Sequence, residues 1–460
     1  MHGARPVAVV GAGWSGLAAA LVLARAGVRV TLFDAAPRAG GRARTVELAT
    51  PLGRIAIDNG QHLIVGAYRA TLQLLDELDA TPHLARHPMR LESVSGLSLR
   101  TAPLPAPLHL AWGLLHARGL RWSERVAVIR LLHGLGRASW RVPEGETVAA
   151  LLARHRQPVA LAARLWAPLC VATLNTLPQQ ACARTFATVL RDTLGAARAA
   201  SDFIAPDAPL GALLPDRAVA QLGRLGATIR LHTTVRELQR SADGWHVGAH
   251  ATGFATVLLA LPPWSAARLA APLGLDITAL QAFEPEPIAT AWALWPAGEA
   301  PRVPRWLMLD EDPARQRFGQ WVFDRGVIGA VRVAGVVVSV ASRIAGEPPG
   351  AVAAGIVDQL REAIGGPPAA ALRIVTERRA TFRCTPLRPR LSCDHFRHAA
   401  PGLWLAGDWV WPDYPATLEA AVRSGRHAAA CILADLAAQS GGPESARSTP
   451  RPQRQAASSA

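Results

Sequence analysis

The chain contains no lysine, few cysteines and no long apolar segment. None of its uninterrupted apolar runs reaches the ~20 residues that a helix needs to cross a membrane. The first run, Val7 to Val10, leads straight into a glycine and has no charged segment before it, so it predicts a strand and not a secretion signal. We therefore expect a cytoplasmic protein, and we leave open a peripheral position at the inner face of the membrane.

The five cysteines are odd in number and show no CxxC spacing. This pattern predicts neither a disulfide framework nor a zinc site, and it favours a reducing compartment. We therefore expect no bound metal. The cysteines are Cys170, Cys182, Cys384, Cys393 and Cys431.

Arginine supplies the whole basic surplus, since 49 basic residues against 34 acidic ones give a formal net charge of +15. Such a surplus attracts anions, including phosphates, nucleic acids and an anionic membrane face. No nucleic-acid-binding motif accompanies it, so we expect no nucleic-acid partner. A GC-rich genome that encodes arginine in place of lysine explains the surplus as well as a role at a membrane surface does.

The N-terminus has the pattern of a βαβ unit. Residues 6–10 predict a buried strand, residues 11–16 a turn, residues 17–26 a helix and residues 28–33 a second strand. Asp34 follows the second strand directly. A right-handed crossover between parallel strands is the expected geometry of such a unit.

The turn of this unit is the glycine fingerprint of dinucleotide-binding proteins. Gly11 allows the tight turn, Gly13 lets the backbone approach a diphosphate, and Gly16 lets the helix pack against the strand. The N-terminus of the helix then faces the phosphates with its partial positive charge. Asp34 is placed to bind a ribose hydroxyl pair, which disfavours a 2′-phosphorylated cofactor. The residues between the glycines, Trp14 and Ser15, belong to the same predicted site.

Two further segments extend this site. Gly40-Gly41-Arg42 follows Asp34, and such a glycine pair can approach a diphosphate that the arginine neutralises. The Gly40-Gly41-Arg42 segment resembles one that is typical of FAD enzymes. The alternative interpretation of this segment is a polar loop that binds no ligand. Asp58-Asn-Gly60-Gln61-His62 follows a short strand. Gly60 permits close backbone approach to a ring system, with Gln61 and His62 beside it, although His62 is also compatible with a core histidine that caps the next helix.

A third segment with the same predicted ligand lies near the C-terminus. Gly407-Asp408 follows the buried strand predicted over residues 403–406, and Thr417 and Leu418 open the last helix. The acid can hold the ribityl or diphosphate region, and the helix N-terminus can stabilise negative charge on a flavin. A helix cap and turn is the alternative for this segment. Because three distant segments agree on one ligand, we predict FAD as the cofactor.

The order of predicted elements indicates an α/β protein with a discontinuous Rossmann-like FAD-binding domain, which resembles the amine-oxidase type, and an inserted α+β substrate domain. We expect the FAD-binding domain in residues 1–90, 205–265 and 378–437, and the substrate-binding domain in residues 91–204 and 266–377. We add Val235, from a strand predicted over residues 234–238, to the cofactor-binding residues. The Ser-, Pro- and Gly-rich residues 438–460 are expected to form a disordered tail.

The chain resembles the amine-oxidase and phytoene-desaturase superfamily of FAD proteins, and within it the hydroxysqualene dehydroxylase branch. The resemblance runs through residues 7–431. Residues 409–414 depart from the small, Thr/Gly-rich loop of the family. The segments that carry the resemblance are Asp58 to Thr71, Leu165 to Thr176, Phe186 to Asp192, Gly407 to Trp409, Pro415 to Glu419 and Arg423 to Gly425.

This resemblance implies an oxidoreductase that removes the hydroxyl group of hydroxysqualene to give squalene for hopanoid biosynthesis. The substrate is then an isoprenoid. No second glycine fingerprint provides a nicotinamide site, and the electron donor stays unidentified. The reaction needs a proton donor, for which we favour His62 as the catalytic residue near the flavin. The other candidates are Asn175, Asp192, Asp408 and Tyr414.

The helical stretch from Pro107 to Trp140 carries tryptophan, leucine and arginine, so it suits docking on a bilayer as well as packing on the substrate domain.

Other functions stay open too. They are a carotenoid- or squalene-type desaturase, a non-catalytic lipid-binding protein that retains FAD, and an amine oxidase. An amine oxidase needs an aromatic pair facing the flavin, for which only Trp409, Trp411 and Tyr414 are available.

Overall fold

Three separate stretches of the chain build one parallel five-stranded sheet with the order β10-β2-β1-β13-β19 in the computed structural model, which describes residues 6–248 and 253–440. Every residue of its four strands from β2 to β19 is buried, as expected for a sheet covered on both faces. The strands are β10 (Thr228–Arg230), β2 (Val30–Phe33), β1 (Val7–Val10), β13 (Thr256–Leu259) and β19 (Leu403–Leu405).

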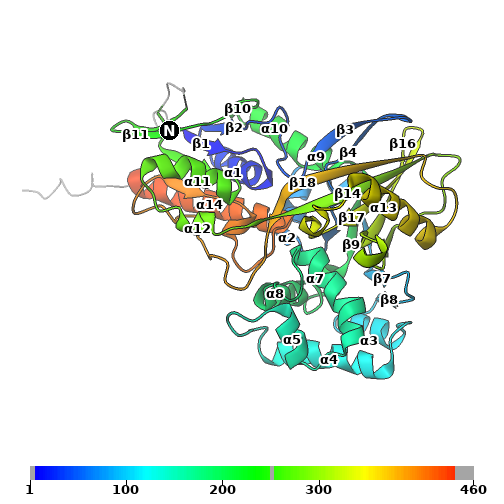
Figure 1. Cartoon of the computed structure of the whole chain (residues 1–460). Coiled ribbons are helices and arrows are strands. Elements are labelled where there is room, and N and C mark those ends of the chain that lie inside the picture. Colours follow the sequence, from blue (N-terminus) through cyan, green and yellow to red (C-terminus); the bar gives the residue numbers. More distant parts are fainter. Residues whose placement is uncertain (1–5, 249–252, 441–460) are drawn as a thin grey trace, which may run out of the picture.

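Two long helices of this domain cross at close range, and Figure 1 shows them side by side at the blue and red ends of the chain. A Cβ atom on Gly425 of α14 (Leu418–Ser440) would lie 2.0 Å from the backbone oxygen of Ser15 in α1 (Trp14–Arg25). Only glycine allows this crossing. The other helices of the domain are α2 (Arg69–Glu77), α9 (Leu210–Leu213), α10 (Pro215–Arg224), α11 (Pro263–Ala270) and α12 (Thr278–Gln281).

A second, antiparallel sheet has the order β15-β16-β17-β14-β18. Helix α13 (Pro349–Ile364) packs its buried side chains on one face of this sheet, and the hairpin of β3 (Thr45–Thr50) and β4 (Gly53–Asp58) packs on the other. The strands are β15 (Trp306–Met308), β16 (Trp321–Ile328), β17 (Val331–Val338), β14 (Pro285–Pro296) and β18 (Ala371–Phe382).

A group of helices lies below both sheets in Figure 1, joined to them by two small sheets. Among the described residues, every helix is too short or too polar to traverse a bilayer. The helices are α3 (Leu108–Leu115), α4 (Trp122–Arg137), α5 (Val148–Arg154), α6 (Val159–Leu161), a π-helical turn (Ala162–Trp166), α7 (Ala167–Leu174) and α8 (Ala183–Thr193). The short strands are β5 (Ile64–Val65), β6 (Leu84–His87), β7 (Arg90–Glu92), β8 (Ser98–Arg100) and β9 (Phe203–Pro206), and a separate hairpin joins β11 (Leu238–Ser241) to β12 (Gly244–Val247).

The predicted fold class is confirmed, because the parallel sheet is assembled from three separate stretches of the chain. The strand predicted over residues 234–238 is wrong, since the chain turns at His232, where φ is 54°, and no strand begins before Leu238. The tail predicted from residue 438 is wrong at its start, because α14 continues to Ser440, and residues 441–460 lie outside the described residues. Since β18 runs unbroken across residue 378, we propose the domain boundary at residue 383.

Candidate functional site

A cavity of about 320 Å³ lies at the carboxyl ends of β1 and β2, between the parallel sheet and the antiparallel sheet. Ligands of open α/β sheets bind at this edge, beyond the strand ends. The predicted site residues that line the cavity are Gly11, Gly13, Trp14, Ser15, Asp34, Gly41, Arg42, Gly60, Gln61, His62, Gly407, Asp408, Thr417 and Leu418.

The glycine turn forms one wall of the cavity. Gly11 has a φ of 111°, and a Cβ atom there would lie 2.4 Å from the Ala260 carbonyl oxygen. Gly16 does not line the cavity but backs this wall, since a Cβ atom on it would lie 1.8 Å from the Gly11 oxygen. Gly13 is the N-cap of α1, where no side chain accepts from the backbone and no acid occupies the first turn. The first turn of α1 therefore meets the cavity with positive backbone dipoles.

The end of β2 holds a carboxylate at the same wall. The Oδ2 atom of Asp34 accepts a hydrogen bond from the Ala12 backbone (2.6 Å), and its Oδ1 atom accepts one from the Ala36 backbone (2.7 Å). These two bonds fix the carboxylate while leaving it acceptor capacity for a ligand hydroxyl. Trp14, in contrast, is buried and donates its indole N–H to the Ala43 carbonyl (3.2 Å).

An ion pair closes the cavity across a sequence separation of 366 residues. The guanidinium of Arg42 donates to the buried carboxylate of Asp408 (2.7 Å) and to the Ala380 carbonyl (3.0 Å). Burial acts to lower the pKa of Arg42, but the charge of Asp408, its hydrogen bond to Arg42 and the charge of Glu377 together outweigh burial, so the pKa of Arg42 is raised. Arg42 therefore stays a cation and meets the cavity with a fixed positive charge.

His62 lines the cavity where it meets the antiparallel sheet. The backbone N–H of its neighbour Gln61 donates a hydrogen bond to the Thr290 hydroxyl oxygen of β14 (3.3 Å). The His62 Nδ1 atom lies 2.8 Å from the Gly60 carbonyl oxygen. Since a carbonyl only accepts, Nδ1 carries the proton and Nε2 is the free acceptor. Burial, helped by the charge of nearby Arg325, lowers the pKa of His62 to about 4, although the hydrogen bond to the Gly60 carbonyl acts to raise it. The imidazole is therefore neutral at neutral pH.

The third predicted cluster sits at the start of α14. The Thr417 hydroxyl accepts from the Ala420 backbone (3.2 Å) and so caps this helix. Tyr68 hydrogen-bonds the Thr417 side chain, and burial raises the pKa of Tyr68 well above its usual value. The buried carboxylate of Glu419 accepts from the backbone of Thr71 (2.8 Å), which joins α14 to the start of α2. Tyr68 therefore keeps its phenolic proton beside a residue of the cavity wall.

The other proton-donor candidates lie elsewhere or are fully engaged. The side chain of Asn175 donates to the Thr381 hydroxyl (2.8 Å) and accepts from the Val340 backbone (2.6 Å), so it joins α7 to the antiparallel sheet. Asp192 pairs with Arg191 outside the cavity. Tyr414 is buried, lies beneath Arg423, and lines a different cavity.

The aromatic residues considered for amine oxidation do not form a pair in the cavity. Trp409 is buried and donates its indole N–H to the Leu261 carbonyl (2.9 Å). Trp411 and Tyr414 line the second cavity and not the one beside the glycine turn. Among the described residues, the wall of the cavity beside the glycine turn contains one tryptophan, Trp14, and no tyrosine or phenylalanine.

The sequence predictions missed one wall of the site. Strand β18 contributes Glu377, Ala380 and Thr381, and β14 contributes Ile288. The β-branched run Ile374-Val375-Thr376 was the available signal for this strand. Val235, which was predicted to bind the cofactor, does not line the cavity; it lies half-buried in the irregular segment before β11.

The cavity fits a dinucleotide on features of its own. Backbone approach is possible at Gly13 and Gly41, because a Cβ atom on Gly41 would lie only 3.1 Å from the Gly13 Cα atom. An uncapped helix N-terminus and the Arg42 cation suit a diphosphate, and Asp34 suits a ribose.

The family of flavin-containing amine oxidoreductases matches residues 14–433 of the chain. The chain belongs to this family.

Two relatives and one solved structure are similar to the chain over nearly its full length. The chain is 31% identical to a hydroxysqualene dehydroxylase of Rhodopseudomonas palustris, over 94% of this chain and 99% of that protein. It is 30% identical to a hydroxysqualene dehydroxylase of Sinorhizobium fredii, over 93% of this chain and 98% of that protein. The cyclohexylamine oxidase of Brevibacterium oxydans shares its fold, with a TM-score of 0.66, 20% identity, and coverage of 94% of this chain and 100% of that one.

These findings confirm the resemblance to hydroxysqualene dehydroxylases that the sequence motifs predicted. As a member of the flavin-containing amine oxidoreductase family, the protein is an FAD-dependent oxidoreductase. The cavity beside the glycine turn is where we propose that the cofactor binds, held by the residues that were predicted for it, apart from Gly16 and Val235.

Proposed function

We propose that the protein removes the hydroxyl group of hydroxysqualene to give squalene, as a step of hopanoid biosynthesis. The observation that supports this most is the near full-length match to two proteins named hydroxysqualene dehydroxylase. The C–O bond of the substrate breaks, the oxygen leaves as water, and the carbon gains a hydrogen, so the reaction consumes two electrons and two protons. Bound FAD, once reduced, would supply the two electrons as a hydride equivalent.

His62 takes a different part in this reaction from the acid that the sequence suggested. A neutral imidazole with its proton on Nδ1 presents only an acceptor at Nε2. We propose that Nε2 accepts a hydrogen bond from the substrate hydroxyl and orients it, because this atom has no proton to give at neutral pH.

The proton for the leaving hydroxide is proposed to come from Tyr68. Its phenol stays protonated because burial raises its pKa. Tyr68 does not line the cavity itself, so its proton would pass through the hydroxyl of Thr417, which lines the cavity and is hydrogen-bonded to Tyr68. Apolar side chains of the same wall, Leu261, Ile288 and Leu418, exclude water from the reacting centre. Water exclusion suits a reaction that passes through developing positive charge on carbon.

The experiment follows the reduced protein under anaerobic conditions. Hydroxysqualene is added, flavin reoxidation is followed by absorbance, and product is identified by mass spectrometry. Squalene formed in step with reoxidation supports the proposal. Reduced flavin that persists with hydroxysqualene present would refute it. Oxidised flavin that is reduced by a polyene, or peroxide released with an amine, would then identify a desaturase or an amine oxidase.

Three variants test the assigned roles in this assay. Tyr68→Phe removes the proton donor and should slow squalene formation by roughly 100-fold or more, as is usual for loss of a general acid. His62→Gln should weaken substrate binding more than it slows turnover. Asp192→Asn is the control, because Asp192 lies outside the cavity, and its rate should match that of the unmodified protein.

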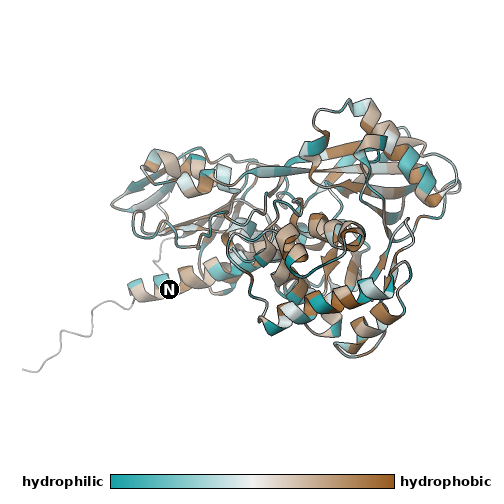
Figure 2. Ribbon diagram, turned by 60° about the horizontal axis from the view of Figure 1, so that its bottom comes forward, coloured by the Kyte–Doolittle hydropathy of each residue, from teal (hydrophilic) through white to brown (hydrophobic). Residues whose placement is uncertain are grey.

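We also propose that the protein docks on an anionic membrane face through α3 and α4. Both helices expose apolar side chains, of which Trp122 is 65% exposed, and Figure 2 shows brown hydrophobic positions along these outward-lying helices. Arginines flank them, and the guanidinium of Arg125 stacks over Trp122 at 4.4 Å. Apolar side chains beside arginines are typical of helices that lie in the interface of anionic bilayers. The exposed apolar residues are Leu108, Trp112, Leu115, Trp122, Val126 and Ile129.

Vesicle flotation tests this docking. The protein should float with vesicles that contain phosphatidylglycerol and should bind neutral phosphatidylcholine vesicles less. The double change Trp112→Ser and Trp122→Ser should abolish flotation, whereas Leu387→Ser, at an apolar residue that is 81% exposed elsewhere on the surface, should not. Equal flotation of both variants would refute the proposed face without touching the proposed reaction.

A further inference from the structure

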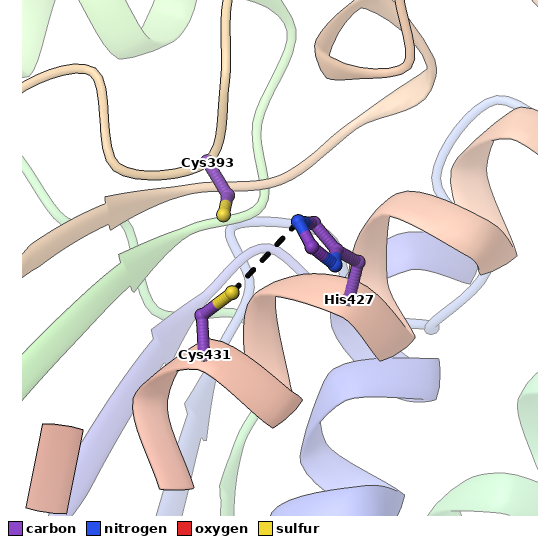
Figure 3. Close-up of side chains that lie close together, drawn as sticks. All are labelled: Cys393, His427 and Cys431. Atoms are coloured by element: carbon purple, nitrogen blue, oxygen red, sulfur yellow. Dashed lines mark hydrogen bonds between the residues drawn. The ribbon is translucent and has the colours of Figure 1, made fainter. Parts of the chain in front are cut away.

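Two sulfur atoms and an imidazole converge outside the cavity beside the glycine turn. Figure 3 shows Cys393, His427 and Cys431 with their side chains directed toward one another. The Cys431 Sγ and His427 Nε2 atoms are 3.8 Å apart, and the ligand atoms of all three residues lie within 4.8 Å of one another. None of the three lines the cavity proposed for FAD.

Rigid elements hold this cluster in place. His427 and Cys431 are four residues apart on α14, so they project from the same face of the helix one turn apart. Cys393 comes from the segment between β18 and β19, and its carbonyl accepts from the Leu405 backbone of β19 (2.8 Å). The cluster therefore joins a segment at the edge of the parallel sheet to the long helix that opens at the proposed FAD site.

We propose that Cys393, His427 and Cys431 form a binding site for a thiophilic metal ion, with Zn²⁺ as the favoured ion. Two sulfurs and one imidazole nitrogen are a donor set that zinc prefers, and oxygen-loving ions such as Mg²⁺ do not bind it. Metal bonds of ~2.3 Å to sulfur and ~2.0 Å to nitrogen place tetrahedral ligands roughly 3.5–3.8 Å apart. The observed spacing needs only a small movement of the side chains to reach this geometry.

The site has an open side for a fourth ligand. Cys393 and His427 line a cavity of about 840 Å³ that also contains five arginines, namely Arg141, Arg184, Arg191, Arg390 and Arg423. Zn²⁺ with two thiolates is neutral overall, so the positive wall does not oppose the bound ion. The same wall favours an anion or a hydroxide as the fourth ligand.

Proton release accompanies binding at such a site. Cysteine binds a metal ion as its thiolate, and a free thiol, with an ordinary pKa of about 8.5, is mostly protonated at neutral pH. Each Zn²⁺ ion must therefore displace two protons as it forms two Zn–S bonds and one Zn–N bond. Affinity should rise with pH for this reason. No electrons are exchanged.

The direct test uses the purified FAD-containing protein under reducing, anaerobic conditions. Zn²⁺ is titrated by equilibrium dialysis against a chelator of known affinity, and bound metal is counted by mass spectrometry. Co²⁺ is used as a spectroscopic replacement, because its tetrahedral thiolate complexes absorb in the red, where oxidised flavin does not. We expect one ion per chain, tetrahedral Co²⁺ bands and tighter binding at higher pH.

Variants assign the ion to this cluster. His427→Gln and Cys431→Ser should each weaken Zn²⁺ binding by roughly 100-fold, since three protein ligands are reduced to two. His427 is exposed, so its replacement leaves the core intact. His398→Gln is the matched control at an exposed histidine of the neighbouring segment, and it should bind as the unmodified protein does.

Three results would overturn the proposal. They are a stoichiometry near zero, octahedral Co²⁺ bands, and Zn²⁺ affinity that is unchanged in both His427→Gln and Cys431→Ser. Unchanged affinity in both variants would show that the ion binds at another place in the chain. A Cys393–Cys431 disulfide in protein kept under reductant, detected by mass spectrometry, would equally exclude the site.

Discussion

Replacing Gly13 and Gly16 by alanine, one at a time, separates ligand approach from packing in the glycine turn. A Cβ atom on Gly16 would lie 1.8 Å from the Gly11 oxygen and 3.1 Å from the Ala260 Cβ atom. Backbone and core atoms cannot yield here, so α1 must move away from β1. We expect Gly16→Ala to lower the free energy of unfolding by about 3 kcal/mol or more and to lose FAD with it.

Gly13→Ala should behave differently. The φ of Gly13 is −74° and its ψ is 178°, which alanine adopts freely, and the nearest atom to the added Cβ is the Gly41 Cα at 4.0 Å. The free energy of unfolding of the apoprotein should change by no more than about 0.5 kcal/mol. The methyl group occupies the wall of the cavity, so FAD affinity should fall about 10-fold or more, which is roughly 1.4 kcal/mol.

Urea unfolding of the apoprotein and titration with FAD, followed by flavin fluorescence, measure the two effects separately. Gly136→Ala is the control, because an added Cβ in the last turn of α4 meets no atom within 4 Å. It should leave FAD affinity unchanged and raise stability by up to about 1 kcal/mol through helix propensity. Unchanged FAD affinity in Gly13→Ala would refute the proposed diphosphate position, and a Gly16→Ala protein of normal stability would refute the packing argument.

Three further predictions concern charge and hydrogen bonding. The pKa of about 4 for His62 in the folded protein lies below the pKa of histidine in the unfolded chain, so protonation favours unfolding as the pH falls below about 6.5. Between about pH 7.5 and pH 5 the unmodified apoprotein should lose roughly 1–2 kcal/mol more stability than the His62→Gln apoprotein. Equal losses of the two proteins in urea titrations would contradict the burial of His62. Arg42→Met leaves Asp408 buried without its partner, so it should lower the free energy of unfolding by about 2–4 kcal/mol, and adding Asp408→Asn should restore part of this loss; additive effects in thermal melts would show that the pair is not coupled. Asn175→Ala leaves the buried Val340 backbone donor unpaired and should lower the free energy of unfolding by about 3 kcal/mol, whereas loss of activity in a protein of normal stability would identify Asn175 as a catalytic residue.

The contact between Asn175 and Val340 shows that a motif can be typical of a family without containing a catalytic residue. Asn175 adopts a left-handed conformation at the end of α7, with φ of 46°, and Val340 has φ of 51°. A β-branched residue such as Val340 is rarely found at a positive φ. The buried backbone N–H of Val340 needs a hydrogen-bond partner, and the Asn175 side-chain oxygen provides it. The segment from Leu165 to Thr176 therefore carries packing information, which sequence comparison detects without revealing its role.

Local patterns in the sequence determined the βαβ unit, the class of cofactor and the parallel sheet. Gly16 is required by a contact within one turn, with the Gly11 oxygen. A buried apolar run followed by this glycine pattern and a helix is typical of a dinucleotide-binding βαβ unit. The resemblance to a family also followed from short motifs. These features depend on residues that are close together in the chain, so they can be read before any tertiary contact is known.

Only the tertiary structure decided the features that join distant residues. It brought Arg42 to Asp408 and supplied a cavity wall from β18. Desolvation and the Gly60 carbonyl made His62 a neutral acceptor, because the pKa of a buried group depends on everything that surrounds it. The convergence of Cys393 with the cysteine and histidine of α14 has no signal in the spacing of the cysteines, since one ligand comes from another part of the chain.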